Sequence, residues 1–250
     1  MAELMFESYQ VPGLFIGTQS AMSLYSSGQT TGLVVDSGAN ESYVVPVYQG
    51  APMTSAIQRL SVAGNDVTAR LYDLLNSNAT IKLDSRTVNE IKERHCLIRK
   101  IAATSCDSLT REYTLPDGSR VQLGSELCEA PEVLFRPVVG GIDLPGLHEF
   151  VYRSVKRTPD ELANFFYTNI VLAGANTLMA GFGDRLKHEM TVKLTNERQS
   201  FNVGVMVPDD RRYSSWIGAS ILGLVSNFGA LCATRHDYDE HGSNVVRKFS

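Results

Sequence analysis

Short β-rich runs alternate with helical patterns along the chain, and this alternation limits the possible folds more than any other feature. Residues 31–35 and 42–48 are two β-rich runs, and the small and acidic residues 36–40 between them form a turn. Residues 169–173 (NIVLA) have the composition of a buried strand. The alternation predicts an α/β architecture, in which residues 31–48 form a β-hairpin.

Helical patterns separate these strands. Residues 67–76 place their apolar side chains on one helix face, with Asp66 as a candidate N-cap. Pro145 suits the first position of another helix, and residues 158–161 (TPDE) have the pattern of a capping box. Helices are predicted over residues 17–26, 67–76, 85–97, 145–156, 182–191 and 216–228. The last of these is expected to be largely buried, and a polar surface tail is expected from His236 onward.

The charge balance gives no sign of a polyanionic partner. The chain has 250 residues, 23 of them Lys or Arg and 27 Asp or Glu, for a formal charge of −4. Neither nucleic-acid binding nor a basic membrane-binding face is therefore predicted. The apolar run at residues 217–225 is far too short to span a bilayer, which takes about 20 residues. A hydrophobic content of 43 % excludes disorder and allows one large domain or two lobes.

The cysteines favour a reducing compartment. Cys96, Cys106, Cys128 and Cys232 form no C-x-x-C pair and no disulfide framework, so free buried thiols are expected. Residues 1–7 carry acids and no basic n-region, and no secretory signal is predicted there. The expected location is intracellular.

The turn at residues 36–40 is the motif that most suggests a ligand-binding role. Its Ser37-Gly38 backbone can present N–H groups to phosphate oxygens, and Asp36 can hold water on a divalent metal. On residues alone, an ordinary hairpin turn is favoured over a phosphate site. Residues 174–177 (GANT) also lie between a strand and a helix, but they lack the lysine and spacing of a P-loop. The simplest interpretation of Lys92 and Glu93 is that they lie on a solvated helix face.

Ten stretches of the chain resemble one family when they are taken in order. They are residues 5–7 (MFE), 19–25 (QSAMSLY), 30–38 (TTGLVVDSG), 45–50 (VPVYQG), 91–93 (IKE), 113–118 (YTLPDG), 130–137 (APEVLFRP), 169–174 (NIVLAG), 216–222 (WIGASIL) and 238–240 (YDE). In this order and spacing they resemble the actin and actin-related proteins. The resemblance extends over essentially the whole chain.

The resemblance implies the ATPase fold that actins share with Hsp70 and the sugar kinases, with a nucleotide cleft between two lobes. Residues 1–26 and 214–250 match a remnant of the first lobe (subdomain 1). Residues 27–62 and 144–213 match subdomain 3, and residues 63–143 match subdomain 4. One lobe is thus expected to be complete and the other only partly present. In family members, the first phosphate loop and the small tip subdomain precede the position that Met1 of this chain matches.

The resemblance also assigns roles to residues of this chain. Gln19 matches a catalytic glutamine that positions the hydrolytic water, and Asp36 matches the acid that faces metal-bound waters. The positions that match nucleotide-binding residues are Asp36, Ser37, Gly38, Gly64, Lys92, Glu93, Gly174 and Arg212. Of these, Ser37 and Gly38 match the second phosphate loop, and Gly64 matches a glycine that faces the ribose.

Several positions depart from the family pattern. Ala39 replaces an aspartate, Tyr43 a histidine that helps to organise the hydrolytic water, and Met179 a tyrosine that packs on the base. Asn40 and Ala175 replace glycines. Since phosphoryl transfer depends on several oriented groups, the sequence predicts weak binding of ATP or ADP with Mg²⁺ and weak or absent hydrolysis.

The expected function is therefore that of an actin-like cytoskeletal protein in the cytoplasm, which acts mainly as a binding or structural subunit. Its expected partners are cytoskeletal or actin-family proteins, at an apolar surface near residues 216–228. Self-polymerisation is not expected, because the tip subdomain that one subunit offers to the next is absent from these residues. The alternative is that this chain is a fragment of a conventional actin-type protein, which binds ATP and forms filaments. A sugar-kinase-like phosphotransferase is less favoured, since the matching stretches are those of actins.

Overall fold

The computed structural model describes residues 1–77, 82–101 and 109–249 of the chain. Its central element is a mixed sheet with the strand order β4-β3-β2-β8-β9, in which β5 also pairs with β3. These strands are β2 Gly32–Ser37, β3 Ser42–Tyr48, β4 Ala51–Pro52, β5 Gln58–Leu60, β8 Ile170–Ala173 and β9 Val205–Met206. Strands β2 and β3 form the predicted antiparallel hairpin, and β8 runs parallel to β2.

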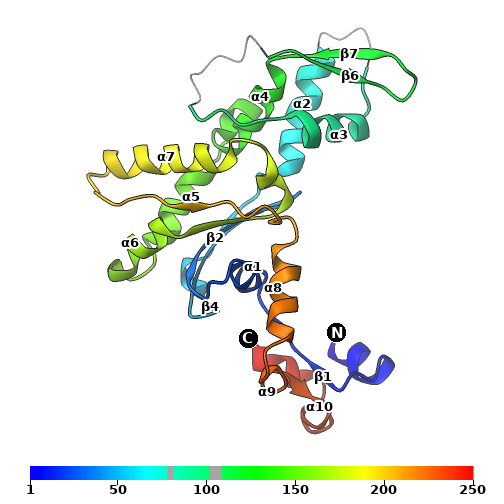
Figure 1. Cartoon of the computed structure of the whole chain (residues 1–250), viewed down its shortest axis with the longest axis vertical. Coiled ribbons are helices and arrows are strands. Elements are labelled where there is room, and N and C mark those ends of the chain that lie inside the picture. The colour runs from blue at the N-terminus through cyan, green and yellow to red at the C-terminus, as the bar shows by residue number, and fades with distance from the viewer. Residues whose placement is uncertain (78–81, 102–108, 250) are drawn as a thin grey trace.

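Both faces of the sheet are covered by helices, as the strand residues require. Leu33 and Val35 of β2 point into the large core, whereas Val34 points into a smaller core on the other face. The large core includes side chains of α5 Leu147–Val155, α6 Asp160–Thr168 and α7 Phe182–Asn196. Helix α1 Gln19–Ser26 fills the smaller core and packs against α8 Ser214–Gly223 (Figure 1). A strand buried on both faces is a continuous apolar run, which is why residues 32–35 show no polar alternation.

A second unit lies at one end of the molecule, at the top of Figure 1. It contains helices α2 Gly64–Ser77 and α3 Ser85–His95 and the hairpin of β6 Arg111–Thr114 with β7 Arg120–Leu123. Short helices α4 Glu126–Glu129, η3 Ala130–Leu134 and η4 Pro137–Gly140 lead back toward the sheet. Their apolar residues continue the large core, so the two parts share one hydrophobic interior.

The two ends of the chain meet in a small unit at the other end (Figure 1). Strand β1 Gly13–Leu14 pairs with β10 Ala233–Thr234. The Phe6 and Tyr238 rings stack with centroids 4.8 Å apart, and the Tyr238 hydroxyl donates to the Glu7 carboxylate at 2.6 Å. Around them lie η1 Leu4–Ser8, α9 Phe228–Leu231, α10 Arg235–His241 and η6 Gly242–Phe249. This unit has its own small core.

The structure confirms the α/β class and most predicted elements but corrects several helix starts. Helix α2 begins at Gly64, so Asp66 lies in its first turn, where it accepts a hydrogen bond from the Ala63 N–H at 2.8 Å. Helix α5 begins after Gly146, which leaves Pro145 outside it. The predicted capping box is also wrong, because the Thr158 hydroxyl donates back to the Val155 carbonyl.

Larger differences occur at the C-terminal end. The predicted helix over residues 216–228 breaks after Gly223, and it is not largely buried: Trp216 is 73 % exposed and Leu224 is 85 % exposed. The expected polar tail instead forms α10 and η6, with Val245 buried. Among the cysteines, Cys96 and Cys232 are free and buried as predicted.

The free-thiol prediction is wrong for Cys128, which is disulfide-bonded, and Cys106 lies outside the described residues. None of the described helices is both long and apolar enough to cross a membrane. The division into subdomain-like segments at residues 27, 63, 144 and 214 stays a prediction.

Candidate functional site

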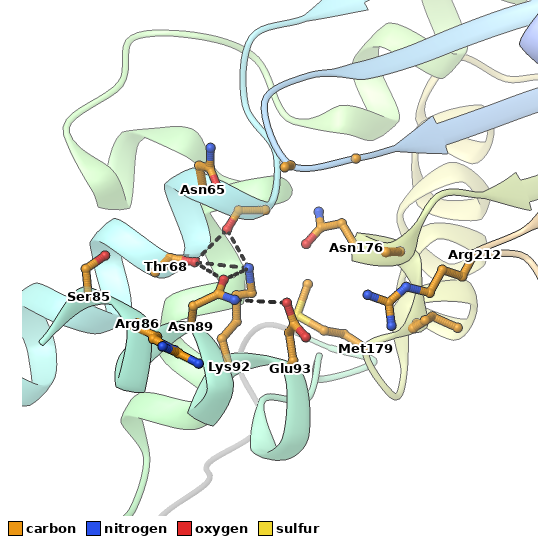
Figure 2. Close-up of a pocket in the computed structure, with 15 residues that line it drawn as sticks. Asn65, Thr68, Ser85, Arg86, Asn89, Lys92, Glu93, Asn176, Met179 and Arg212 are labelled. Carbon is orange, nitrogen blue, oxygen red and sulfur yellow. Dashed lines mark hydrogen bonds between the residues drawn. The ribbon is translucent and has the colours of Figure 1, made fainter. Parts of the chain in front are cut away.

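An open cavity of about 710 Å³ lies between the tip of the β2–β3 hairpin, helices α2 and α3, and the short helix η5 Ala175–Leu178. Its volume is typical of small-molecule sites. The residues that line it are Gly38, Ala39, Gly64, Asn65, Thr68, Ser85, Arg86, Asn89, Lys92, Glu93, Ala175, Asn176, Leu178, Met179 and Arg212. Figure 2 shows their arrangement.

The parallel strands β2 and β8 end beside this cavity. Ligands bind beyond the carboxyl ends of strands in open α/β sheets, and Asp36 of β2 is paired there with Ala173 of β8. The chain leaves β8 through Gly174, whose φ is +85°. A Cβ at Gly174 would lie 2.3 Å from the Ser37 carbonyl oxygen and 2.4 Å from Asp36 Oδ1. Only glycine therefore lets this turn approach the hairpin so closely.

The hairpin tip is bonded to the start of α2. The Gly64 N–H donates to the Gly38 carbonyl at 3.0 Å, and the Asn65 N–H donates to the Ala39 carbonyl at 2.7 Å. The first N–H groups of a helix have no partner within the helix itself, and two of those in α2 already donate to the hairpin tip. A Cβ on Gly64 would lie 3.1 Å from the Gly38 oxygen and 3.3 Å from Asn176 Oδ1, so the wall is closely packed here.

Lys92 lies in the wall but its ammonium group is occupied. The Nζ donates to the Gly64 carbonyl at 3.1 Å, to Thr68 Oγ1 at 3.0 Å and to Asn89 Oδ1 at 2.9 Å. These three acceptors match the three donors of an ammonium group. Burial lowers the pKa of Lys92. Its observed role is to join α2 to α3, and the sequence interpretation of a solvated helix face is wrong for this residue.

The exposed charges of the cavity are Glu93, Arg86 and Arg212. The Glu93 carboxylate accepts from Asn89 Nδ2 at 2.9 Å. The Arg212 side chain extends toward Asn176 and Met179 from the opposite wall (Figure 2). Two exposed guanidinium groups beside one exposed carboxylate make the opening suitable for an anionic ligand.

Ser37 is fully buried and lies behind the cavity wall rather than in it. Its Oγ lies 2.7 Å from Ser42 Oγ and accepts a hydrogen bond from Asn176 Nδ2 at 2.8 Å. The hydroxyl therefore holds the hairpin and η5 together.

Gln19 and Asp36 form a pair outside the cavity lining. The Gln19 Nε2 donates to Asp36 Oδ2 at 2.9 Å. Burial raises the pKa of the Asp36 carboxyl. The structure thus brings the predicted glutamine and the predicted metal-facing acid together, at the end of β2 and the start of α1.

Five of the nine predicted site residues line the cavity, namely Gly38, Gly64, Lys92, Glu93 and Arg212. The other four lie behind or beside it, namely Gln19, Asp36, Ser37 and Gly174. Sequence reasoning missed Thr68, Asn89 and Asn176, which contact the predicted residues directly. Thr68 lies four residues after Gly64, and Asn89 lies three residues before Lys92. Helix spacing could therefore have identified both residues. Asn176 belongs to the GANT motif at residues 174–177, a weak phosphate-loop candidate that does not single out this residue.

Comparisons with known proteins agree with the geometry. A family model described as Actin matches residues 1–250. The chain belongs to the actin family. It is 38 % identical over 261 aligned residues to a Neurospora crassa protein described as an actin-like protein, and the match covers 100 % of this chain and 68 % of that one. Membership of the actin family confirms the predicted resemblance and the actin-type α/β fold.

Proposed function

We propose that this protein is an actin-like cytoskeletal subunit of the cytoplasm that acts mainly by binding other proteins. In this proposal its cavity holds an adenine nucleotide with Mg²⁺ weakly and hydrolyses it slowly or not at all. Membership of the actin family supports the cytoskeletal assignment and actin-family or cytoskeletal partners. The finer claims rest on the contacts of the cavity.

The residues present fit a nucleotide. The glycines Gly38 and Gly64 give the cavity a backbone-lined wall beside which we place the phosphates, and Arg212 adds positive charge at the opposite wall. Leu178 and Met179 give the cavity an apolar wall against which a base can pack. Asp36, at the end of β2, is the carboxylate proposed to face metal-bound water. When bound, the Mg²⁺ nucleotide supplies the phosphoanhydride that is open to hydrolysis.

The observation that carries the claim of weak binding is that the cationic and N–H donors of the inner wall are already used. Lys92 has three acceptors within the protein, and the Gly64 and Asn65 N–H groups donate to the hairpin tip. Ala39 brings no polar side chain to that tip. A phosphate group here gains only exposed partners such as Arg212, whose charge is screened by water.

Slow hydrolysis follows from the groups around Gln19. Its amide is held by Asp36, and neither residue lines the cavity. Tyr43, directly opposite Asp36 on β3, donates its hydroxyl to the Glu41 carboxylate. A phenol engaged in this way does not replace an imidazole as a proton acceptor.

The proposed partner surface is the apolar side of α8 and the residues that follow it. This helix carries no charged residue, and one of its sides packs against α1. Trp216, Ile221, Leu224 and Val225 are exposed. Such a surface is typical of a protein–protein interaction site, because single isolated apolar residues are common on surfaces but contiguous ones are not.

Calorimetric titration with Mg-ATP tests the nucleotide claim. We expect a dissociation constant well above micromolar, and a further weakening in Arg212→Ala because a cation of the cavity is lost. Arg157→Ala is the matched control, since Arg157 is exposed but does not line the cavity. Submicromolar affinity would contradict the proposal and favour the conventional actin-type alternative.

Phosphate release tests the hydrolysis claim separately. We expect no turnover above background in the wild-type chain and no change in Gln19→Ala. Steady release that Gln19→Ala abolishes would show that Gln19 acts on the hydrolytic water and that the site is a working ATPase.

A further inference from the structure

Helix α8 has one covered side and one open side. On the covered side, Ser214 Oγ lies 3.0 Å from Ser23 Oγ of α1. A Cβ added at Gly218 would lie 1.7 Å from the Met22 carbonyl oxygen, so the two helix backbones touch there. Figure 1 shows α1 against this side of α8. Four exposed residues form the opposite side, namely Trp216, Ala219, Ser220 and Gly223.

The open side is large at one end and small along the rest of its length. Residues three, four and seven positions apart share one face of a helix, so these four side chains form a single row. Trp216 stands at the start of the row, and Ala219, Ser220 and Gly223 follow. A Cβ added at Gly223 would meet no atom within 4 Å. The tryptophan ring and this bare backbone are two helical turns apart, about 10 Å.

A row of this kind is complementary to itself. When two α8 helices lie antiparallel around a two-fold axis that passes beside Ala219 and Ser220, Trp216 of each copy lies over Gly223 of the other. The small residues between them let the two helices approach closely. The antiparallel arrangement also sets the positive end of each helix beside the negative end of the other. Large side chains therefore meet small ones on both sides of the axis.

The charge distribution also favours a second copy as the occupant. An interface around a two-fold axis uses the same surface on both copies, so a charged residue near the axis lies against its like. The chain has a formal charge of −4, but residues 213–234 contain no Asp, Glu, Lys, Arg or His. Ile221, Leu224 and Val225, which are also exposed, add apolar area around the row.

We propose that α8 binds α8 of a second copy of this chain, antiparallel and around a two-fold axis. The dimer uses the partner surface proposed above and so rests on that proposed function. Each Trp216 ring is the central anchor, the role that buried aromatic residues have in many interfaces. Because both copies use the same surface, the dimer is closed and adds no third copy. A cytoskeletal partner that binds α8 competes with the dimer.

Sedimentation equilibrium over a range of protein concentrations tests the dimer. The mass of the wild-type chain should rise from 27.4 kDa to twice that value as the concentration is raised. Trp216→Ala should raise the dissociation constant of the dimer at least about tenfold, because the anchor is lost. Gly223→Leu should have a similar effect, because its side chain fills the place of the ring. Gly229→Leu is the matched control, since its added Cβ also meets no atom within 4 Å but lies outside α8.

A charge at Ser220 tests the two-fold arrangement itself. Ser220 lies beside the proposed axis, so the two copies of this residue face each other. Ser220→Asp alone and Ser220→Lys alone should stay monomeric, because like charges meet. An equimolar mixture of the two variants should recover the dimer mass, because opposite charges then meet. Ser220 is exposed, and the melting temperatures of both variants should equal that of the wild type.

Three outcomes would overturn the proposal. A wild-type mass that stays at 27.4 kDa at every concentration removes the dimer. A dimer that survives both Trp216→Ala and Gly223→Leu, or that Gly229→Leu also breaks, has its interface elsewhere. A mixture of the Ser220 variants that stays monomeric contradicts the two-fold axis. A monomeric chain that still sediments with actin filaments would leave the proposed function standing, with another protein on α8; loss of both would contradict that function too.

Discussion

The carboxylate of Asp36 is partly buried at the end of β2, and the Gln19 amide donates a hydrogen bond to it. Burial raises its pKa above the ordinary value of 3.8. A raised acid pKa means that the folded state favours the protonated form. The contribution of this group to stability is therefore complete below pH 3.8 and is lost as the pH rises through the folded-state pKa.

We predict that Asp36→Asn is more stable than the wild type at pH 7, because the neutral amide avoids the desolvation cost and still accepts from Gln19. The expected rise in melting temperature is about 2–4 °C. The advantage should shrink as the pH falls and Asp36 becomes protonated. Melting curves from pH 3.5 to 7.5 measure the difference in melting temperature between the two proteins. A difference that stays constant across this range would refute a raised pKa for Asp36.

Gly174 is the residue whose replacement should distort the site most directly. We predict that Gly174→Ala loses at least about 1–3 kcal/mol of unfolding free energy, the cost of this glycine-only backbone region. The contact of its Cβ with the Ser37 carbonyl, 2.3 Å away, adds to this loss. In Gly223→Ala, where no atom lies within 4 Å of the added Cβ, no loss is expected. Urea denaturation compares the two; equal effects would contradict the prediction.

At the scale of elements, a buried ion pair joins η3 to α7. Arg185 is fully buried and donates Nη1 and Nη2 to the two oxygens of Glu132 at 2.8 and 2.9 Å. Arg99 also approaches Glu132 Oε1, at 3.4 Å. The Arg185 guanidinium lies 4.9 Å from the Phe135 ring centroid. These contacts connect the two units that border the cavity.

We predict that Glu132→Gln loses about 3 kcal/mol of unfolding free energy, since the buried Arg185 guanidinium loses its two-oxygen partner and keeps only the Glu189 carboxylate, at 2.7 Å. The comparison is Glu112→Gln, which breaks the exposed pair with Arg120 and should cost no more than about 1 kcal/mol. Chemical denaturation of both variants provides the measurement. A small effect of Glu132→Gln would mean that the second unit is held mainly by its apolar core.

At the scale of the whole molecule, the open side of α8 is the surface that we propose for partner binding. A filament needs two complementary surfaces on each subunit, and the apolar surface proposed here supplies one. The polypeptide of these 250 residues is therefore predicted to bind a partner rather than to polymerise alone.

Sedimentation under the salt and Mg-ATP conditions that polymerise actin tests this prediction. We expect the chain to stay in the supernatant alone and to sediment with actin filaments. Trp216→Ser with Leu224→Ser should reduce co-sedimentation several-fold without lowering the melting temperature, because both side chains are exposed. Regular filaments of the chain alone, seen by microscopy, would contradict it.

The sequence alone determined most of the local elements and the family. The β-rich run at residues 31–35 predicted a strand, and the small residues after Asp36 predicted the hairpin turn, because both patterns depend on neighbours in the chain. The order of the ten motif stretches was enough to identify the actin family.

The tertiary structure decided which polar groups remain available. Lys92 and Ser37 are predicted site residues by position, but both are occupied within the protein. Lys92 Nζ donates to the Gly64 carbonyl, 28 residues away in sequence, and Ser37 Oγ accepts from the distant Asn176 Nδ2. Asn176 Nδ2 lies 2.8 Å from Ser37 Oγ although the two residues are 139 positions apart in sequence. Helix α8 is rich in apolar residues, which predicted burial, but burial also requires a neighbouring element on each side of the helix. Which donors are occupied and which faces are covered depends on contacts between segments far apart in sequence, and a local pattern does not contain them.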